Sequence, residues 1–206
     1  MDYRDKLPDS ALLRSAGELE YLVWRPEEKI VVIGNGDKKE NSVYTEYVEK
    51  NRIPVIKRKT GGHAVVLTPK MIAVSLVIKT DPPPLSSVLF STCNRAVISA
   101  LSELGIHPLA EKGISDIALG TKKIAGAAVY RNRNLAFYHS IVNIGEEPAD
   151  MDKILKYPKK TPEYRKMRPH SDFVTSLWSE GFLISLPIIR EKVEKKLAKL
   201  QIRDFF

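Results

Sequence analysis

Three strand-like segments follow one another in the middle of the chain, and they restrict its fold more than any other feature. They are SDIALG (115–120), KIAGAAVY (123–130) and LAFYHSIVNIG (135–145), with short turn-forming stretches at 120–122 and 131–134 between them. Glycine and asparagine in such connections favour tight turns between neighbouring strands. We therefore expect an antiparallel meander at the centre of the protein.

The rest of the chain divides into further strands and into helices. A β-branched run at 72–79 ends at the prolines of 82–84, which cannot donate to a strand ladder. Apolar residues at helical spacing predict a helix from Leu85 to Leu104, with Cys93 on its buried face. We also expect strands at 19–24 and 29–34, joined as a hairpin, strands at 53–58 and 64–67, and helices at 42–52, 149–157, 171–181 and 186–200, with Ser171 as an N-cap.

Strands and helices segregate along the sequence rather than alternate. This arrangement predicts an α+β fold, in which a mixed, largely antiparallel β-sheet is flanked by α-helices. A chain of 206 residues with 43% hydrophobic residues can bury a substantial core. We expect residues 1–206 to form a single domain, without a C-terminal accessory domain.

The charge and the cysteine content restrict the partners and the compartment. A formal charge of +8 indicates an anionic partner, but zinc-finger spacing, an RNA-recognition aromatic signature and a long basic tail are all lacking, which disfavours nucleic acid. The single cysteine excludes a disulfide framework and fits a reducing compartment, and no histidine pair has zinc-ligand spacing. No apolar run has the length of a signal peptide or a membrane span. We expect a soluble, cytoplasmic protein with no metal site and no membrane contact.

The stretch VIKRKTGGHAVVL (55–67) places cations and two glycines inside a strand pattern. Gly61 and Gly62 remove side chains and let a ligand approach the main-chain N–H groups. Arg58 faces one side of an extended strand while its neighbours face the other. Two interpretations stay open: an anion or planar-ligand site, and a β-bulge with solvated charges.

A second candidate site lies in GTKKIAGAAVY (120–130). Small residues after Lys123 leave a shallow surface that can take an extended acyl chain. If Lys123 faces inward, its ammonium can hold the carbonyl and phosphate oxygens of an acyl phosphate. The alternative is a packed strand with two surface lysines.

Together these stretches resemble the catalytic domain shared by lipoate–protein ligases, lipoyl and octanoyl transferases and, more distantly, biotin ligases. Residues 57–65 match that family's Arg-Arg-x-Ser/Thr-Gly-Gly-Gly/Arg-Ala-Val motif, and 115–128 match its Asn-Asp strand and Lys-Ile/Val-Ser/Ala-Gly-Ser/Asn-Ala motif. Tyr138-His139-Ser140 stands at its His-His-Gly strand, VVIGNG resembles its Val-Ile-Gly-Arg strand, and SDFVTSL resembles its Ser-Val-x-Ser-Arg-Val stretch. The resemblance extends from about Glu18 to about Leu183.

The resemblance implies a class II synthetase-like fold and a chemistry. ATP, with Mg²⁺, and lipoate would form lipoyl-adenylate, and the lipoyl group would pass to a lysine of a lipoyl domain of 2-oxoacid dehydrogenase E2 or of the glycine-cleavage H protein. Lys123 would be the catalytic residue, and Asp116 would help to place metal and phosphate or the incoming lysine. The resemblance puts these further residues in the acyl and nucleotide sites: Arg58, Thr60, Gly61, Gly62, His63, Ala64, Gly126, Ala127 and His139. Acceptor domains of this class tend to be acidic, which gives the positive charge a partner.

Several positions depart from the family pattern. The first motif arginine is Lys57, a glycine position is His63, and Leu67, Thr68 and Ile141 replace polar family residues. These changes leave open a non-catalytic relative that binds acyl groups or lipoyl domains. An octanoyl or lipoyl transferase without ATP needs a cysteine nucleophile, and Cys93 lies upstream of the positions that those cysteines occupy, which favours the ligase. Many relatives also have a C-terminal domain, so either this chain works alone or a separate small accessory subunit supplies that part.

Overall fold

The computed structural model describes residues 7–206. Within this part of the chain, the centre is a six-stranded antiparallel sheet. Its strands in spatial order are β1 (Leu19–Trp24), β5 (Met71–Ile78), β9 (Ala136–Asn143), β8 (Lys122–Arg131), β7 (Asp116–Leu119) and β6 (Leu109–Lys112). The predicted meander is confirmed as β7, β8 and β9, and the predicted α+β class is confirmed with it. β6 was not predicted, because it is a short edge strand with little hydrophobic alternation.

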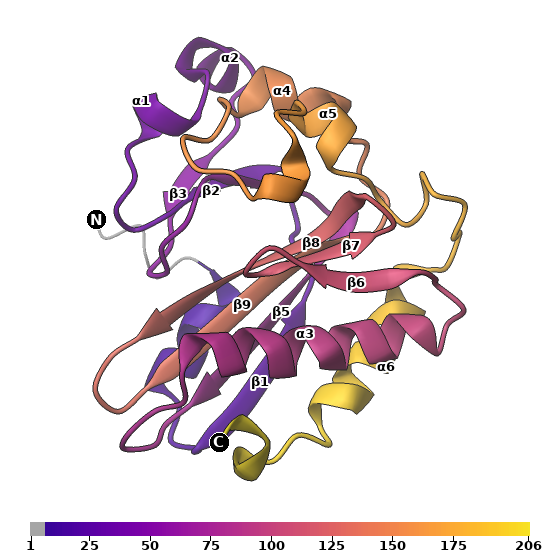
Figure 1. The fold of residues 1–206 in the computed structure, drawn as a ribbon. Helices are drawn as coiled ribbons and strands as arrows, with labels where there is room; N and C mark the ends of the chain where they lie inside the picture. Colours follow the sequence, from indigo (N-terminus) through magenta and orange to yellow (C-terminus); the bar gives the residue numbers. More distant parts are fainter. Residues whose placement is uncertain (1–6) are drawn as a thin grey trace.

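A second sheet of three strands lies beside the first (Figure 1). It consists of β3 (Val55–Lys57), β2 (Ile30–Ile33) and β4 (Val65–Leu67), with β2 parallel to β3 and antiparallel to β4. The predicted hairpin of residues 19–34 is wrong, because β1 pairs with β5 and β2 belongs to the second sheet. Every residue of β5 is buried, so this strand needs a partner at each edge, and β1 provides one from Ala73 to Ile78.

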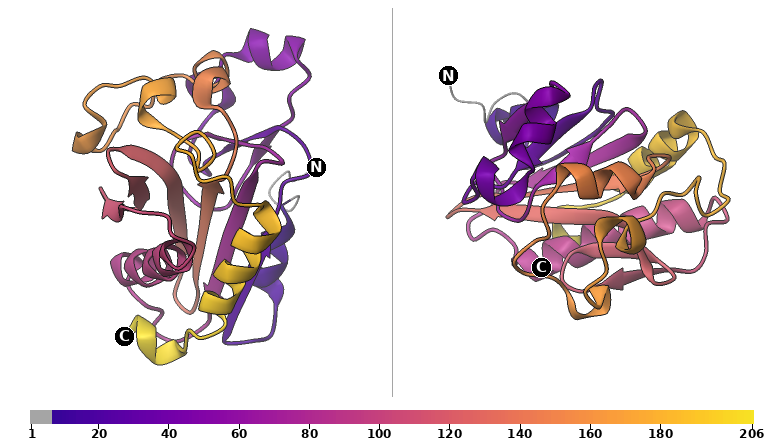
Figure 2. Two further views of the ribbon diagram at one scale, coloured as in Figure 1. Left: turned by 90° about the vertical axis from the view of Figure 1, so that its right-hand side faces the viewer. Right: turned by 90° about the horizontal axis from the view of Figure 1, so that it is seen from above.

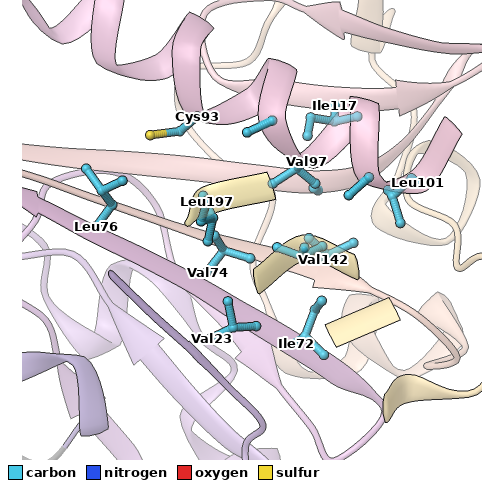
Figure 3. Close-up of a cluster of buried hydrophobic side chains, with 14 of the residues drawn as sticks. Val23, Ile72, Val74, Leu76, Cys93, Val97, Leu101, Ile117, Val142 and Leu197 are labelled. Carbon is cyan, nitrogen blue, oxygen red and sulfur yellow. The ribbon is translucent and has the colours of Figure 1, made fainter. Parts of the chain in front are cut away.

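Two long helices, α3 (Ser86–Ser102) and α6 (Leu186–Leu197), pack on one face of the large sheet. Figure 3 shows Cys93, Val97 and Leu101 of α3 in the apolar cluster with Val74 and Leu76 of β5. Cys93 is fully buried, which confirms its predicted place in the core, and burial raises the pKa of its thiol well above the ordinary value. This layer provides the main hydrophobic core.

Short helical segments lie at the opposite end of the molecule (Figures 1 and 2). The α-helical ones are α1 (Lys39–Ser42), α2 (Thr45–Lys50), α4 (Met151–Ile154) and α5 (His170–Phe173), and the 3₁₀ segments there are η3 (Pro148–Asp150) and η4 (Glu163–Arg165). Two 3₁₀ segments lie elsewhere: η2 (Pro8–Arg14) packs against β1 and β5, and η5 (Ile202–Phe205) lies by α3. None of the helices in the described part of the chain is long and apolar enough to cross a membrane.

The predicted helix at 171–181 is mostly wrong. Only α5 is helical there; it starts one residue before Ser171 and is preceded by Pro169. The carboxylate of Asp152 accepts hydrogen bonds from the N–H groups of His170 and Ser171, so Ser171 is not the N-cap. Beyond α5 the chain is tied to the large sheet, where Thr175 N–H donates to Lys123 O at 2.9 Å. These hydrogen bonds to strands replace the intrahelical ones.

The face of the large sheet opposite α3 packs against the small sheet. Trp24 of β1 and Ala73 of β5 form a cluster with Val32, Ile56 and Leu67 of the small sheet. The two sheets therefore enclose a second apolar layer, and the candidate site lies in it.

Candidate functional site

A row of directly opposed residues crosses five strands of the large sheet on the face toward the small sheet. In register, Asp116 of β7 stands opposite Gly126 of β8, which is opposite Ile141 of β9, and Ile141 is opposite Ala73 of β5, which is opposite Trp24 of β1. Directly opposed residues point to the same face of a sheet. With strands about 4.8 Å apart, the row is about 19 Å long. The row begins at the carboxyl side chain of Asp116 and ends at the indole ring of Trp24.

A cavity of about 880 Å³ lies over this row, and all of its residues except Ala73 line the cavity. Its apolar walls include Val32, Leu67 and Met71. The predicted site residues that line it are Arg58, Gly62, His63, Ala64, Asp116, Lys123, Gly126, Ala127 and His139. Gly61 lines a neighbouring cavity of about 460 Å³, together with Gly62, His63 and Ala64. Thr60 lines neither cavity and is fully buried behind the first.

Lys123 and Asp116 form an ion pair at the polar end of the row. Lys123 Nζ lies 2.7 Å from Asp116 Oδ1, and the Tyr164 hydroxyl donates to Asp116 Oδ2 at 2.8 Å. Burial and the Asp116 carboxylate raise the pKa of Tyr164, so its phenol stays protonated and remains a donor. The Asp116 side chain is 9% exposed and that of Lys123 is 28% exposed. Both residues line the cavity, and the ammonium is the more accessible member of the pair.

Gly126 leaves the space in which the Lys123 side chain lies. A Cβ at this position would stand 2.6 Å from Lys123 Cε and closer still to Nζ. A register shift between β7 and β8 at Ile117 and Ala118 brings Lys123 onto this face. The glycine in the motif is therefore required by the lysine three residues before it.

We call residues 58–64 the glycine loop, and this loop is organised around the buried guanidinium of Arg58. Arg58 Nε donates to Thr60 Oγ1 at 2.9 Å, and Nη1 donates to Val32 O at 3.1 Å. Nη2 donates to Gly61 O at 2.7 Å and to His63 O at 2.8 Å. Burial lowers the pKa of Arg58 to about 10, so it remains charged at neutral pH. Three of these four hydrogen bonds therefore go to residues of the loop, and the fourth joins the loop to β2.

These hydrogen bonds direct the amides of the loop away from Arg58. A carbonyl and the next N–H belong to one planar peptide and point in opposite directions. Because Gly61 O and His63 O face Arg58, the N–H groups of Gly62 and Ala64 point away from Arg58, and both residues line the cavities. Gly62 has φ +92°, a conformation that favours glycine. The loop is thus suited to bind an anionic or carbonyl oxygen through its main chain.

A buried polar chain continues from Thr60. Thr60 Oγ1 lies 2.7 Å from His139 Nε2, and His139 Nδ1 lies 3.3 Å from Asp9 Oδ2. Ser75 Oγ donates to the same Asp9 oxygen at 2.7 Å. Sequence reasoning missed Asp9, because it lies in η2, far along the chain from the motifs that it contacts.

The segment 156–168 covers the polar end of the cavity and contains six of the chain's cations, Lys156, Lys159, Lys160, Arg165, Lys166 and Arg168. Arg165 is 4% exposed, its guanidinium lies over the rings of Tyr157 and Phe173, and its Nη2 has no hydrogen-bond partner among the described residues. Arg168 Nη2 ties the segment to Thr121 O at 2.9 Å. The sequence motifs did not reveal Tyr164 or Arg165, although the density of cations there was a usable signal.

The positions that depart from the family pattern lie in different surroundings. Leu67 and Ile141 line the apolar part of the cavity. Thr68 is buried and donates to Glu146 at 3.0 Å, and Lys57 lines a separate groove beside α2. His63 is exposed at the boundary of both cavities. The described residues contain no group of three or more His, Cys, Asp or Glu side chains that could hold a metal ion.

Stability is expected to fall as the pH drops below 6.5. Burial lowers the pKa of His139 and of His170 below 6.5, and the nearby guanidiniums of Arg58 and Arg165 act in the same direction. Both imidazoles therefore take up protons more readily once unfolded, so the stability that their neutral forms provide is complete above pH 6.5 and is lost as the pH falls toward their folded pKa values. The slope is at most about 1.4 kcal/mol per pH unit for each histidine.

Urea midpoints at pH 7.5 and 5.5 measure this effect. The Asp152 carboxylate beside His170 does not contribute to the pH dependence of stability between pH 5.5 and 7.5. Burial raises the pKa of Asp152, but hydrogen bonds from Ser171 and His170 outweigh burial and hold this pKa at about 2. His107 is exposed, so His107→Gln should leave the pH dependence unchanged. Equal midpoints at the two pH values would contradict the prediction.

Comparison with known proteins agrees with this geometry. Residues 9–198 match the lipoyl protein ligase A/B catalytic domain. Lipoate-protein ligase A subunit 1 of Thermoplasma acidophilum is 29% identical over 163 residues, which cover 73% of this chain and 61% of that protein. The chain spans 61% of the length of this relative and 47% and 36% of the length of two other curated lipoate–protein ligases that it matches.

Two solved structures have the same fold. The bi-partite lipoate protein ligase of T. acidophilum, studied with its E2 lipoyl domain, superimposes with a TM-score of 0.79 at 23% identity, covering 93% of this chain and 75% of the other. A lipoate-protein ligase A bound with ATP gives a TM-score of 0.77 at 25% identity, covering 93% and 77%. The resemblance of the sequence motifs is confirmed. With a family model that matches nearly the whole chain, this protein belongs to the lipoyl protein ligase A/B catalytic domain family.

Proposed function

We propose that this chain is the catalytic part of a lipoate–protein ligase, which activates lipoate with ATP as lipoyl-adenylate and transfers the lipoyl group to a lysine of an acceptor protein. The observation that carries the proposal is the Lys123–Asp116 ion pair at the polar end of a long, otherwise apolar cavity. An apolar channel that ends at a fixed cation suits an acid with a hydrocarbon tail. The relative bound with ATP supports a nucleotide as the second substrate.

In the first step, the carboxylate oxygen of lipoate attacks the α-phosphorus of ATP. A C–O–P bond forms, the bond to the leaving oxygen of pyrophosphate breaks, and pyrophosphate departs. Lys123 Nζ stabilises the negative charge on the phosphoryl and carboxyl oxygens, because it is a cation that Asp116 already holds in place at the polar end of the cavity. The spare N–H of Arg165 and the amides of Gly62 and Ala64 are further donors for these oxygens.

In the second step, the neutral ε-amine of the acceptor lysine attacks the acyl carbonyl. An amide bond forms, the C–O bond to the phosphate breaks, AMP leaves with the electron pair, and the amine loses a proton. Lys123 now stabilises the negative charge as it moves from the acyl carbonyl oxygen to the phosphate oxygen of the leaving AMP. Asp116 accepts a hydrogen bond from the incoming amine and positions it.

Magnesium fits this site only together with the nucleotide. Mg²⁺ is usually held by one or two carboxylates and by phosphate oxygens rather than by an all-protein cage. Asp116 is the carboxylate beside Lys123 that can contribute, and no cluster of metal-binding side chains exists among the described residues. The ion would supply charge neutralisation on the phosphates.

The acyl chain would lie along the row that crosses the sheet, from Gly126 over Ile141 and Ala73 to Trp24. Replacing Trp24 with leucine is expected to shift the preference toward longer acids, because the indole ends the row. The ratio of kcat/KM for dodecanoate to that for octanoate should rise about tenfold. Mass spectrometry of products from mixed acids measures this ratio independently of the folded fraction.

Tyr21 provides the matched control for Trp24. It lies on the same strand but points to the opposite face, away from the cavity. Tyr21→Leu should leave the ratio unchanged. An unchanged ratio in Trp24→Leu would mean that the acyl chain takes another path.

The structure disfavours the covalent transferase alternative. The chain has one cysteine, and Cys93 lies in the core on the face of the sheet opposite the cavity. Burial raises the pKa of its thiol, which keeps it protonated and a poor nucleophile. An acyl-enzyme on Cys93 would require the main core to open.

The acceptor is proposed to be an acidic lipoyl domain of a 2-oxoacid dehydrogenase E2 or the H protein. The association of a bi-partite relative with its E2 lipoyl domain supports the first of these, and the cations of segment 156–168 provide charge complementarity. The name "subunit 1" of the T. acidophilum relative supports a separate accessory subunit as a further partner.

Intact-mass spectrometry of an apo lipoyl domain tests the proposal. The domain is incubated with this protein, lipoate and Mg-ATP, and in parallel with preformed lipoyl-adenylate or with octanoyl carrier protein. A lipoyl mass shift that requires ATP supports the ligase, and a shift only from the adenylate indicates that activation needs the accessory subunit. A shift from carrier protein alone supports the transferase, and no shift in any arm supports a non-catalytic relative.

A further inference from the structure

A continuous chain of buried polar groups links the N-terminal 3₁₀ segment to the glycine loop. It runs from Asp9 to His139, then to Thr60 and Arg58, and ends at the carbonyls that Arg58 binds. Asp9 is 3% exposed, Thr60 is fully buried and the His139 side chain is 14% exposed. This series of hydrogen bonds joins segments that are 130 residues apart in sequence. None of these groups contacts Lys123, so the pathway is distinct from the ion pair at the polar end.

Only one arrangement of protons gives each hydrogen bond in this series one donor and one acceptor. Arg58 Nε–H donates to Thr60 Oγ1, so the Thr60 hydroxyl proton is available to donate to His139 Nε2. His139 then carries its proton on Nδ1 and donates it to Asp9 Oδ2. In the other neutral tautomer, the Nδ1 lone pair would face the carboxylate, which gives repulsion instead of a hydrogen bond.

The doubly protonated imidazole also fits poorly. Its Nε2–H and Arg58 Nε–H would occupy both lone pairs of Thr60 Oγ1, and the Thr60 proton would then have no acceptor among these groups. The charged groups nearest the ring are Asp9 on one side and Arg58, beyond Thr60, on the other, while the Phe137 ring packs at 5.5 Å between centroids. Burial lowers the pKa of His139, in agreement with a neutral ring.

We propose that Asp9 is a positioning residue that fixes His139 as the neutral Nδ1–H tautomer, so that Thr60 and Arg58 hold the glycine loop in its cavity-facing conformation. With the tautomer fixed, Arg58 keeps Gly61 O and His63 O turned toward its guanidinium, and the amides of Gly62 and Ala64, which line the cavities, point away from it. Asp9 itself also lines the large cavity, but its carboxylate oxygen is engaged by Ser75 and His139. The kinetic consequence of this proposal rests on the proposed ligase function; the structural consequence does not.

Nuclear magnetic resonance of protein labelled with ¹⁵N-histidine tests the tautomer directly. The chain has only four histidines, so each ring can be assigned. Long-range ¹H–¹⁵N correlation at pH 7.5 should give a protonated, pyrrole-type Nδ1 and an unprotonated Nε2 for His139. The opposite pattern, or a doubly protonated ring, overturns the proposal without any mutation.

Three variants then test the role of Asp9. Asp9→Asn keeps an acceptor oxygen and should retain the tautomer, whereas Asp9→Ala should lose it and shift the amide resonances of Gly62 and Ala64. Ser75→Ala removes the other hydrogen bond to Asp9 and should leave His139 and the loop amides unchanged. A folded Asp9→Ala protein with an unchanged tautomer and unchanged loop amides would refute the proposal. If Asp9→Ala does not fold, Thr60→Val removes the hydroxyl that links His139 to Arg58. This variant should shift the amide resonances of Gly62 and Ala64 while His139 keeps its Nδ1 proton.

Kinetics provide the functional measurement. Asp9→Ala should lower kcat/KM of ligation by about tenfold to 100-fold, because the loop amides would be displaced from the substrate oxygens, and a displacement of about 1 Å can cost about 100-fold. Asp9→Asn should restore most of the activity, which a purely electrostatic role for the carboxylate would not allow. If the wild-type protein ligates nothing but His139 has the expected tautomer, the proposed function fails and the positioning role of Asp9 stands.

Discussion

Lys123→Ala is expected to lower kcat/KM for lipoylation by about 10²–10³-fold, the effect of removing one preorganised donor from a developing negative charge. Lys123 Nζ is the ammonium held at the polar end of the cavity, 2.7 Å from Asp116. Loss of the lysine also leaves Asp116 with the Tyr164 hydroxyl as its remaining side-chain partner, which should cost about 1–3 kcal/mol of folding free energy. Mass spectrometry of the acceptor and urea unfolding measure the two effects separately.

Lys122 is the matched control, because it precedes Lys123 on the same strand but points away from the cavity. Lys122 is exposed and pairs with Glu180 at 3.1 Å. Lys122→Ala should keep nearly full activity. Equal activities of the two alanine variants would remove Lys123 from the mechanism.

Gly126→Ala is expected to reduce activity by about 10²-fold while the protein stays folded. The new Cβ would overlap the end of the Lys123 side chain, and that flexible end can move where the backbone cannot. Lys123 then swings away from Asp116, and its ammonium no longer reaches the reacting oxygens. Alanine in a strand interior is itself preferred over glycine by about 0.5–1 kcal/mol, which offsets part of the free energy lost with the Lys123–Asp116 ion pair, so the melting temperature should fall by only a few degrees.

A double-mutant cycle separates this mechanism from a general effect of the methyl group. If Gly126→Ala acts only by displacing the lysine, it should add little further loss in a Lys123→Ala background. Losses that multiply in the double variant would mean that the methyl group blocks the substrate directly.

The local patterns of the sequence predicted the meander, the long helix α3 and the burial of Cys93. They left open whether Lys123 faces the site, because the register shift between β7 and β8 that puts Lys123 on the same face as Asp116 is not visible in the sequence. The pairing of β1 with β5 was not predicted, since a hairpin between adjacent strands is the simpler local solution and the preference for β5 depends on burial across the whole sheet.

The parts of the candidate site that sequence reasoning missed come from segments far from the motifs. Asp9, Tyr164 and Arg165 contact the site through tertiary packing alone, and no spacing along the chain indicates it. Thr60 belongs to a motif, yet its hydroxyl faces away from the cavity toward His139. A motif identifies which residues matter, whereas the structure distinguishes those that can touch a ligand from those that hold the others in place.

The alternation of side chains along the large sheet divides its residues between two evolutionary pressures. On β5, Ile72, Val74 and Leu76 pack in the α3 layer, whereas Met71 and Ala73 face the cavity layer. Drift at the first set is limited by stability, and drift at the second changes which acids fit. Relatives with different substrates can therefore share one core and differ at every second residue of the same strands, so substrate range can diversify in this fold without a new scaffold.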